Sequence, residues 1–260
     1  AFYTKWLQDF EDAQNPDGGV PVIVPSGGWS FDGCHPVWDS AYAVIANEMA
    51  DYLGDKRILK DAFPTLKRYV DFVYAKAKGD LIPFDSLGDW LPWKAETDSK
   101  LISSLMLAEN ARILALSAEL NGDSASQRAY QQMCKRIKEA VWGRFYTPSR
   151  LEQSSQTALA LAVRFELAEG DQAHRTVQAL INKIETQGHI DAGIVGAKHV
   201  LRALSEHGRS DLAYKVVART EQPGWGWWIE QGATTLWEDW KGESSLNHIM
   251  FGDVSNWFIQ

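Results

Sequence analysis

Apolar residues recur at spacings of three and four along most of this chain, which is the period of one buried face of an α-helix. The first fourteen residues show the pattern with Phe2, Trp6, Leu7, Phe10 and Ala13. No succession of alternating apolar and polar runs, the mark of exposed strands, interrupts it. The fold class predicted is all-α, built of helical hairpins. Further helices are expected at residues 40–53, 55–77, 101–121, 123–142, 153–168, 170–187, 193–206 and 208–220.

The ends of these helices carry recognisable signals. Gly54 is expected as a C-cap and Asp55 as the start of the next helix, in which Pro64 marks either a kink or a break between two helices. Thr97 or Asp98 is expected to cap the following helix.

Two loops rich in Gly and Pro interrupt the helices, and long loops inside a compact domain are usually functional. The first carries Trp29, His35, Trp38 and Asp39, and the second carries Asp89, Trp90 and Trp93. Neighbouring Trp and Asp residues recur at 38–39, 89–90 and 237–240. We expect these loops to converge on one rim and to form a single cleft.

Six of the twelve tryptophans fall within residues 225–258, where Glu238 lies between Trp237 and Trp240 and is followed by Asn247 and His248. Flat indole faces suit the apolar faces of sugar rings, and a carboxylate between large apolar surfaces is partly desolvated, which tunes it for proton transfer. This predicts chemistry on a carbohydrate. The alternative is that the tryptophans fill a helical core and that Glu238 is a solvated helix residue.

Glycoside hydrolysis needs two carboxyl groups, one as acid and one as base or nucleophile. The candidates beside tryptophan or glycine are Asp39, Asp89, Glu238, Asp239 and Asp253, and Glu238 has the most suitable surroundings. Asp39 has helix N-capping as an equal alternative, whereas Asp89, in a loop between Gly and Trp, is typical of a ligand contact.

His248 is expected to hydrogen-bond a sugar hydroxyl or a carboxylate. The alternatives for His248 are a buried, satisfied histidine or a neighbour of a helix N-cap at Asn247 or Ser245.

Composition narrows the remaining choices. The chain has 260 residues and no linker, which predicts one domain over residues 1–260. A net charge of -8 with scattered Lys and Arg argues against nucleic acid, and no apolar run reaches the ~18 residues of a membrane span. Cys34 and Cys134 indicate neither a zinc site nor a disulfide framework. GxSxG, P-loop, GxGxxG and HExxH motifs are missing, and the histidines lack metal-ligand spacing, so neither a cofactor nor a metal is predicted.

Several segments together resemble a known family: WLQDFEDAQNPDGGVPVIVP, SLGDWLPW, SQTALALAV, TTLWEDW and SLNHIMFGDVSNWF. In this order, over nearly the whole chain, they are similar to the catalytic domain of α-L-rhamnosidases of glycoside hydrolase family 78. The resemblance implies an (α/α)6 toroid and inverting hydrolysis of terminal α-L-rhamnose. It implies Glu238 as the general base, His248 and Trp90 as sugar contacts, and Trp38 as a residue near the pocket. Asp39, Asp89 and Trp237 complete the predicted substrate-binding set.

The sequence also departs from the family pattern. The family's general acid is a Glu in an Asp-Cys-Pro-x-Arg-x-Glu-like segment upstream of the opening helix, and no such motif occurs here. We therefore expect the chain to be part of a catalytic domain, with the acid segment and a C-terminal β-sandwich outside it. Ten or eleven helices are expected, and unpartnered apolar faces favour a homodimer. Alone, the chain is expected to be inactive or nearly so.

Two other functions are compatible with the same residues. One is a toroidal hydrolase that acts on a different sugar, and the other is a non-catalytic carbohydrate-binding domain. The sequence leaves an extracellular, periplasmic or cytoplasmic location open.

Overall fold

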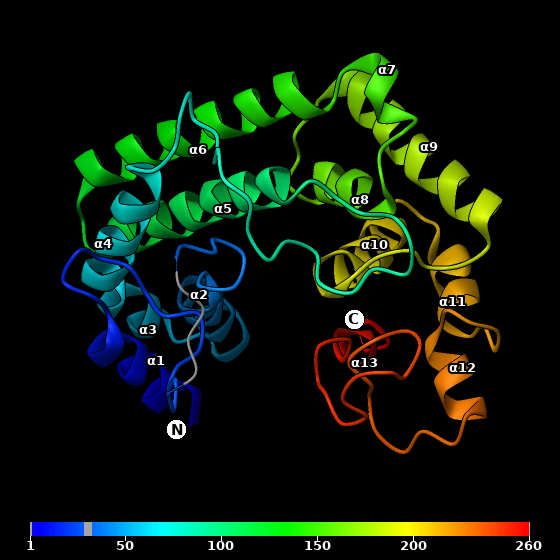
Figure 1. Ribbon diagram of the computed structural model, residues 1–260. Helices are drawn as coiled ribbons and strands as arrows, with labels where there is room; N and C mark the ends of the chain where they lie inside the picture. The colour runs from blue at the N-terminus through cyan, green and yellow to red at the C-terminus, as the bar shows by residue number, and fades with distance from the viewer. Residues whose placement is uncertain (1, 29–32, 260) are drawn as a thin grey trace. The chain divides into compact units, whose positions relative to one another are not determined.

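The computed structural model describes residues 2–28 and 33–259, and its helices fall into two compact units. Unit 1 comprises residues 1–87 and 99–143, and unit 2 comprises residues 88–98 and 144–260. Thirteen helices lie in the described part of the chain, joined by turns and loops (Figure 1). The prediction of a single domain over residues 1–260 stays a prediction.

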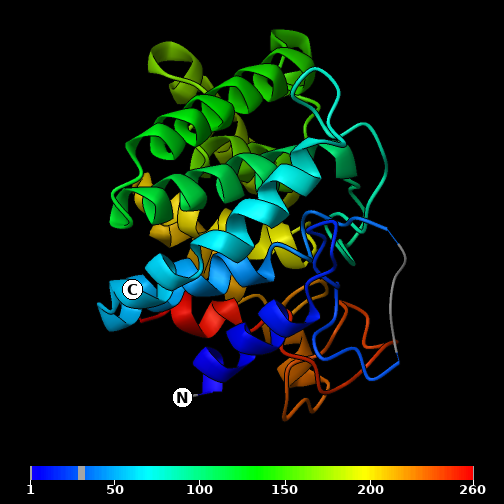
Figure 2. The same cartoon turned by 90° about the vertical axis from the view of Figure 1, so that its left-hand side faces the viewer.

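Unit 1 contains the helices α1 (Phe2–Ala13), α2 (Ala41–Leu53), α3 (Lys56–Asp61), α4 (Phe63–Tyr74), α5 (Ser99–Leu120) and α6 (Ser124–Phe145), the last of which runs on into unit 2. Helix α1 packs on α2, which in turn contacts α3 and α5 (Figure 2). The apolar face predicted for the first helix is buried at Leu7 and Phe10, but Phe2 is 73% exposed. The ring of Phe10 lies 5.9 Å from that of Tyr42.

Helix α5 is the core helix of unit 1, because its sequence is apolar or small on nearly every face. By length and composition alone it could cross a membrane, but 78% of its most apolar window is buried inside the protein. Two of its buried polar residues donate to other helices or their caps: Ser117 donates to the carbonyl of Leu59, and Nδ2 of Asn110 donates to Ser40, although Oδ1 of Asn110 has no partner among the described residues. A buried hydroxyl or amide without a partner would cost free energy, so these bonds allow a polar helix face to be buried.

Unit 2 contains α7 (Pro148–Leu151), α8 (Gln156–Arg164), α9 (Gly170–Gln187), α10 (Ile194–Glu206), α11 (Ser210–Val217), α12 (Trp225–Glu230) and α13 (Asp253–Trp257). Helix α10 is its centre and contacts α8, α9, α11 and α13. The approach of α8 and α10 is close because Gly196 presents no side chain toward Thr157. Ser155 begins α8 as a capping residue, with its hydroxyl accepting from the N–H of Ala158.

Most predicted helix boundaries are confirmed to within a few residues, whereas the predicted number of helices is not. Gly54 is a left-handed C-cap with φ 65°, and Asp55 caps α3 by accepting from the N–H of Arg57. Pro64 lies in the first turn of α4, so the chain breaks at Ala62 rather than kinking. The count of ten or eleven was too low among the described residues, because α7, α12 and α13 are short helices without a long apolar period.

Candidate functional site

Most of the tryptophans in residues 225–258 pack together in the core of unit 2. Trp225, Trp228, Trp237 and Trp240 are between 1% and 9% exposed. The rings of Trp228 and Trp240 stack at 5.1 Å, and Trp225 meets Trp240 edge-on at 4.9 Å. For these four the alternative of a core role is right. The role of Trp237 as a sugar contact stays a prediction.

Glu238 follows the buried Trp237 in the loop between α12 and α13 and does not belong to a helix. Its side chain is partly exposed although both neighbours are buried. The N–H of Glu238 donates to the carbonyl of Ser245 at 2.9 Å, and the N–H of Ser245 donates back to Oε2 of Glu238 at 3.2 Å. The carboxylate is therefore oriented by the backbone and still reachable from solvent. The alternative of a solvated helix residue is wrong.

His248 belongs to the same loop. Its N–H donates to the carbonyl of Leu236 at 2.8 Å, so residues 236–238 and 245–248 are tied together by backbone hydrogen bonds at both ends. Its Nδ1 accepts from the N–H of Met250 at 3.3 Å, which in a neutral ring leaves the proton on Nε2. His248 is partly exposed, and the next helix, α13, begins only at Asp253. The buried and helix-cap alternatives for His248 are both wrong.

Asp239 folds the turn that connects these two segments. Its oxygens accept from the N–H groups of Lys241, Gly242, Glu243 and Ser244, at 2.6, 2.7, 3.1 and 2.6 Å. Burial acts to raise the pKa of Asp239, but hydrogen bonds to the charged carboxylate outweigh it and lower the pKa below its ordinary value. Asp239 therefore stabilises this turn as an ionised carboxylate, and its oxygens are not free to act as a catalytic acid.

Asp89 is buried, with 8% exposed, and both oxygens are occupied by protein donors. Oδ2 accepts from the Thr157 hydroxyl at 2.6 Å and the Gly193 N–H at 2.9 Å. Oδ1 accepts from the N–H groups of Val195 and Gly196, both at 2.9 Å. Burial raises the pKa of Asp89, while these four bonds act to lower it. The Asp89 side chain therefore caps α10, and the sugar contact predicted for it stays a prediction.

The next residue, Trp90, is 39% exposed, so its indole is available to a ligand. Its carbonyl accepts from the N–H of Ile194 at 3.0 Å. Trp93 is partly buried against the core of unit 2, and the ammonium groups of Lys94 and Lys241 lie 5.7 and 6.0 Å from its ring centre. Since Lys241 belongs to the turn after Glu238, the loop of Trp90 and the loop of Glu238 are neighbours within unit 2.

The sequence analysis missed two buried polar residues behind these loops, Asp191 and Gln156, which are 3% and 1% exposed. Oδ1 of Asp191 accepts from the N–H groups of Lys94 and Ala95 at 2.8 and 3.0 Å. Gln156 accepts from the N–H of Asp191 and donates to the carbonyl of His189. The sequence signal for Asp191 is its place in the segment HIDAG: it lies just before the helix α10 but is not the N-cap residue of that helix.

Trp38 and Asp39 belong to unit 1, and their role in the site stays a prediction. Asp39 is 1% exposed and accepts from the hydroxyl of Tyr69 at 2.9 Å and the N–H of His35 at 3.0 Å. Ser40, not Asp39, occupies the cap position of α2, so the N-cap alternative is wrong. Burial raises the pKa of Asp39 to about 6.

Two further residues named from the sequence remain. Asp253 forms an ion pair of 2.9 Å with Arg202, which gives it a structural partner within unit 2. Trp29 lies outside the residues that the structure describes.

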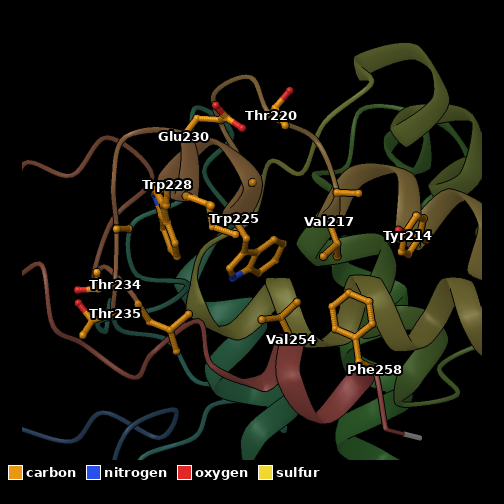
Figure 3. Close-up of a pocket in the computed structure, with 15 residues that line it drawn as sticks. Tyr214, Val217, Thr220, Trp225, Trp228, Glu230, Thr234, Thr235, Val254 and Phe258 are labelled. Carbon is orange, nitrogen blue, oxygen red and sulfur yellow. The ribbon is translucent and has the colours of Figure 1, made fainter.

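An apolar pocket of about 660 Å³ lies beside this loop system, between α11, α12 and α13. Trp225 extends into it toward Val254 and Phe258, and Thr234 and Thr235 border its other side (Figure 3). Glu238 and His248 do not line it. The pocket and the candidate chemistry are therefore separate features of unit 2.

All 260 positions, residues 1–260, match the bacterial alpha-L-rhamnosidase 6 hairpin glycosidase domain. The chain belongs to this family. Membership confirms the predicted resemblance and the fold class, an all-α glycosidase domain of the (α/α)6 type.

Individual family members agree with this assignment. An alpha-L-rhamnosidase of Formosa agariphila is 29% identical over 283 residues, which cover 100% of this chain and 30% of that protein. The structure of alpha-L-rhamnosidase from Dictyoglumus thermophilum matches with a TM-score of 0.92 and 31% identity, over 99% of this chain and 31% of that one. Streptomyces avermitilis alpha-L-rhamnosidase, complexed with L-rhamnose, matches with a TM-score of 0.90 and 27% identity, over 99% and 26%. The chain spans about 30% of the length of these family members.

Proposed function

We propose that this chain is the sugar-processing helical part of an α-L-rhamnosidase, and that Glu238 is the general base of an inverting hydrolysis. The observation that carries the proposal is the setting of Glu238, a partly exposed carboxylate next in sequence to the buried Trp237 and oriented by the N–H of Ser245. Membership of a family of alpha-L-rhamnosidases supports the choice of sugar.

In such a reaction the base removes a proton from the water that attacks the anomeric carbon, on the face opposite to the leaving group. An ionised, hydrogen-bonded carboxylate suits this role because its orientation is set before the substrate arrives. The Nε2–H of His248 is assigned to a sugar hydroxyl, since Nδ1 is already engaged by Met250. The exposed indole of Trp90 is assigned to an apolar face of the sugar ring.

The general acid is assigned to none of the residues described above. Asp89 and Asp239 are surrounded by protein donors, and Asp39 is buried in unit 1. The expectation that the acid is an upstream glutamate outside this sequence stays a prediction.

The test combines binding and turnover on the purified 260-residue chain. L-Rhamnose titrated by calorimetry is a suitable probe, because in an inverting reaction the attacking water becomes the anomeric hydroxyl of the product. We expect binding of L-rhamnose in preference to other hexoses, weakened by Glu238→Gln. Glu243→Gln is the matched control, because Glu243 is an exposed carboxylate in the same loop.

Release of a phenol from an aryl α-L-rhamnoside reports turnover. Loss of a general base or acid typically lowers the rate by about 10²–10⁴-fold, so any activity of the chain should be weak and should fall further in Glu238→Gln. Turnover of another aryl glycoside in place of the rhamnoside would identify a different sugar. Failure to bind L-rhamnose, together with the absence of any effect of Glu238→Gln, would contradict the proposal.

A further inference from the structure

The loop that carries Trp90 and Trp93, residues 88–95, is held at both of its ends by a buried carboxylate. At the first end, Asp89 reaches out of the loop and accepts from the N–H groups of Gly193, Val195 and Gly196. At the second end, Asp191 reaches into the loop and accepts from the N–H groups at positions 94 and 95. We call these two sets of hydrogen bonds the clamps. One carboxylate comes from the loop and the other from residues 191–196, so each segment holds the backbone of the other.

The backbone of the loop also meets α10 at close range. A β-carbon built at Gly193 would lie 2.2 Å from the carbonyl oxygen of Trp90, so any larger residue would push the loop away. The N–H of Ile194 donates to that same oxygen. The position of Trp90 is therefore fixed through its backbone and is independent of its own indole, which stays exposed.

Neither clamp carboxylate has a cation to balance it among the ion pairs of the described residues. The partners of Asp89 are backbone N–H groups and the Thr157 hydroxyl, and those of Asp191 are backbone N–H groups. A carboxylate without a counter-ion is costly to bury, and hydrogen bonds from the loop contact offset that cost here. An apolar side chain at either position would leave these N–H donors without acceptors. The presence of two such carboxylates at one loop is explained if their role is to fix the backbone geometry of that loop.

We propose that Asp89 and Asp191 are positioning residues that hold residues 88–95 as a preformed sugar-binding loop, with Trp90 and Trp93 in place before the substrate arrives. A preformed loop avoids the entropy cost of ordering it upon binding. This inference rests on the proposed function, because it assumes that the indole of Trp90 meets the sugar.

The two clamps differ in a way that a conservative substitution can detect. Oδ1 of Asp191 accepts both of its bonds, and Oδ2 accepts none from the described residues. An asparagine at 191 can therefore keep the clamp with its carbonyl oxygen. Both oxygens of Asp89 face N–H groups, so an asparagine at 89 sets its amide against at least one donor. We expect Asp191→Asn to rescue what Asp191→Ala loses, and Asp89→Asn not to rescue Asp89→Ala.

The experiment measures amide hydrogen exchange of residues 94 and 95 and the affinity for L-rhamnose in the same set of variants. In Asp191→Ala we expect the two amides to lose protection and the affinity to fall about tenfold, which is the scale of ordering a few side chains on binding. Asp191→Asn should restore both. Asp55→Ala is the control, because Asp55 also accepts from a backbone N–H but caps α3 in unit 1, and its loss should lower stability without changing the affinity.

The outcomes separate the inference from the proposed function. Loss of protection in Asp191→Ala with unchanged rhamnose affinity would overturn the positioning role while leaving the function intact. Unprotected amides at 94 and 95 in the wild-type chain would overturn the clamp itself, whether or not rhamnose binds. Protected amides in a wild-type chain that does not bind L-rhamnose would contradict the proposed function and, with it, the sugar-binding part of the inference.

Discussion

Glu238 and Ser245 exchange hydrogen bonds across a seven-residue turn: the N–H of Glu238 donates to the carbonyl of Ser245, and the N–H of Ser245 donates to Oε2 of Glu238. The second bond, 3.2 Å long, is the one that a described residue makes to the Glu238 carboxylate. The orientation of the proposed base therefore depends on one backbone donor.

Ser245→Pro removes that donor while keeping the carbonyl. We expect the affinity for L-rhamnose and any hydrolysis of an aryl rhamnoside to fall roughly tenfold, because a freely rotating carboxylate loses its alignment. Calorimetry and phenol release measure the two effects. Ser245→Ala is the control, since it removes the hydroxyl bonds to Asn247 but keeps the N–H. Equal effects of the two substitutions would contradict the role of the N–H.

Asp239→Asn should destabilise the turn behind Glu238. Both Asp239 oxygens accept from N–H groups, so an amide nitrogen meets a donor in either orientation, at a cost of about 1–3 kcal/mol in the free energy of unfolding. The folded-state pKa of Asp239 is depressed below its ordinary 3.8. Its stabilisation is therefore present above pH 3.8 and is lost as the pH falls through the lower, folded value.

Denaturant unfolding of wild type and Asp239→Asn across this pH range tests the prediction. The difference in stability between the two proteins should be constant near neutral pH and should shrink only in acid. A difference that persists unchanged below the titration range of an aspartate would show that the charge of Asp239 is not its source.

Asp39 is predicted to behave in the opposite way. Its pKa in the folded protein is raised to about 6, from 3.8, chiefly by burial, while the bonds from Tyr69 and His35 oppose the rise. The folded state therefore holds the proton more tightly, so stability is highest below pH 3.8 and falls as the pH rises toward about 6. Asp39→Asn avoids the charge, and the Tyr69 hydroxyl can accept from its amide. We expect it to be more stable than wild type above the folded pKa, by at most about 3 kcal/mol.

The measurement is the free energy of unfolding of wild type and Asp39→Asn on both sides of that range. The advantage of the asparagine should vanish in acid, where the wild-type carboxyl is neutral. Cys34, whose pKa burial raises to about 12, stays neutral throughout and does not confuse the comparison.

Trp237 and Trp90 provide a direct contrast between core and ligand roles. Trp237→Ala removes a ring that packs on Trp227 and Trp228, so we expect a loss of about 3–5 kcal/mol in stability. Trp90→Ala removes an exposed ring and should change stability by less than about 0.5 kcal/mol while weakening L-rhamnose binding. Thermal unfolding and calorimetry on both variants decide the matter. A Trp237→Ala protein of unchanged stability would contradict its core role.

Local signals were enough to predict much of this fold. Helix α9 begins and ends where its pattern predicts, because an amphipathic run of residues 170–187 is closed by Gly188, which is left-handed with φ 70°. The short helix α12 was missed because its six residues are too few to show a repeated apolar period of three and four.

The site was predicted less completely, because some of its residues interact with partners that are far away along the sequence. Glu238 and His248 could be found because their partners are within about a dozen positions and their context is unusual. Asp89 and Asp191 bind groups 104 and 97 residues away, so no local pattern reveals whether each contacts a ligand or the backbone. A buried capping aspartate and a sugar-binding aspartate look the same in a Gly-Asp-Trp segment.

The close approach of α8 and α10 has a consequence for how this family can vary. A β-carbon at Gly196 would lie 2.0 Å from Oγ1 of Thr157, the same atom that donates to Asp89. A homologue with a side chain at position 196 must therefore have a smaller residue without the hydroxyl at position 157, or hold α8 and α10 further apart. In either case the hydrogen bond from the hydroxyl of residue 157 to Asp89 is lost. Substitutions at the two positions should be inherited together, and a change at either should be accompanied by changes in the loop that precedes Trp90.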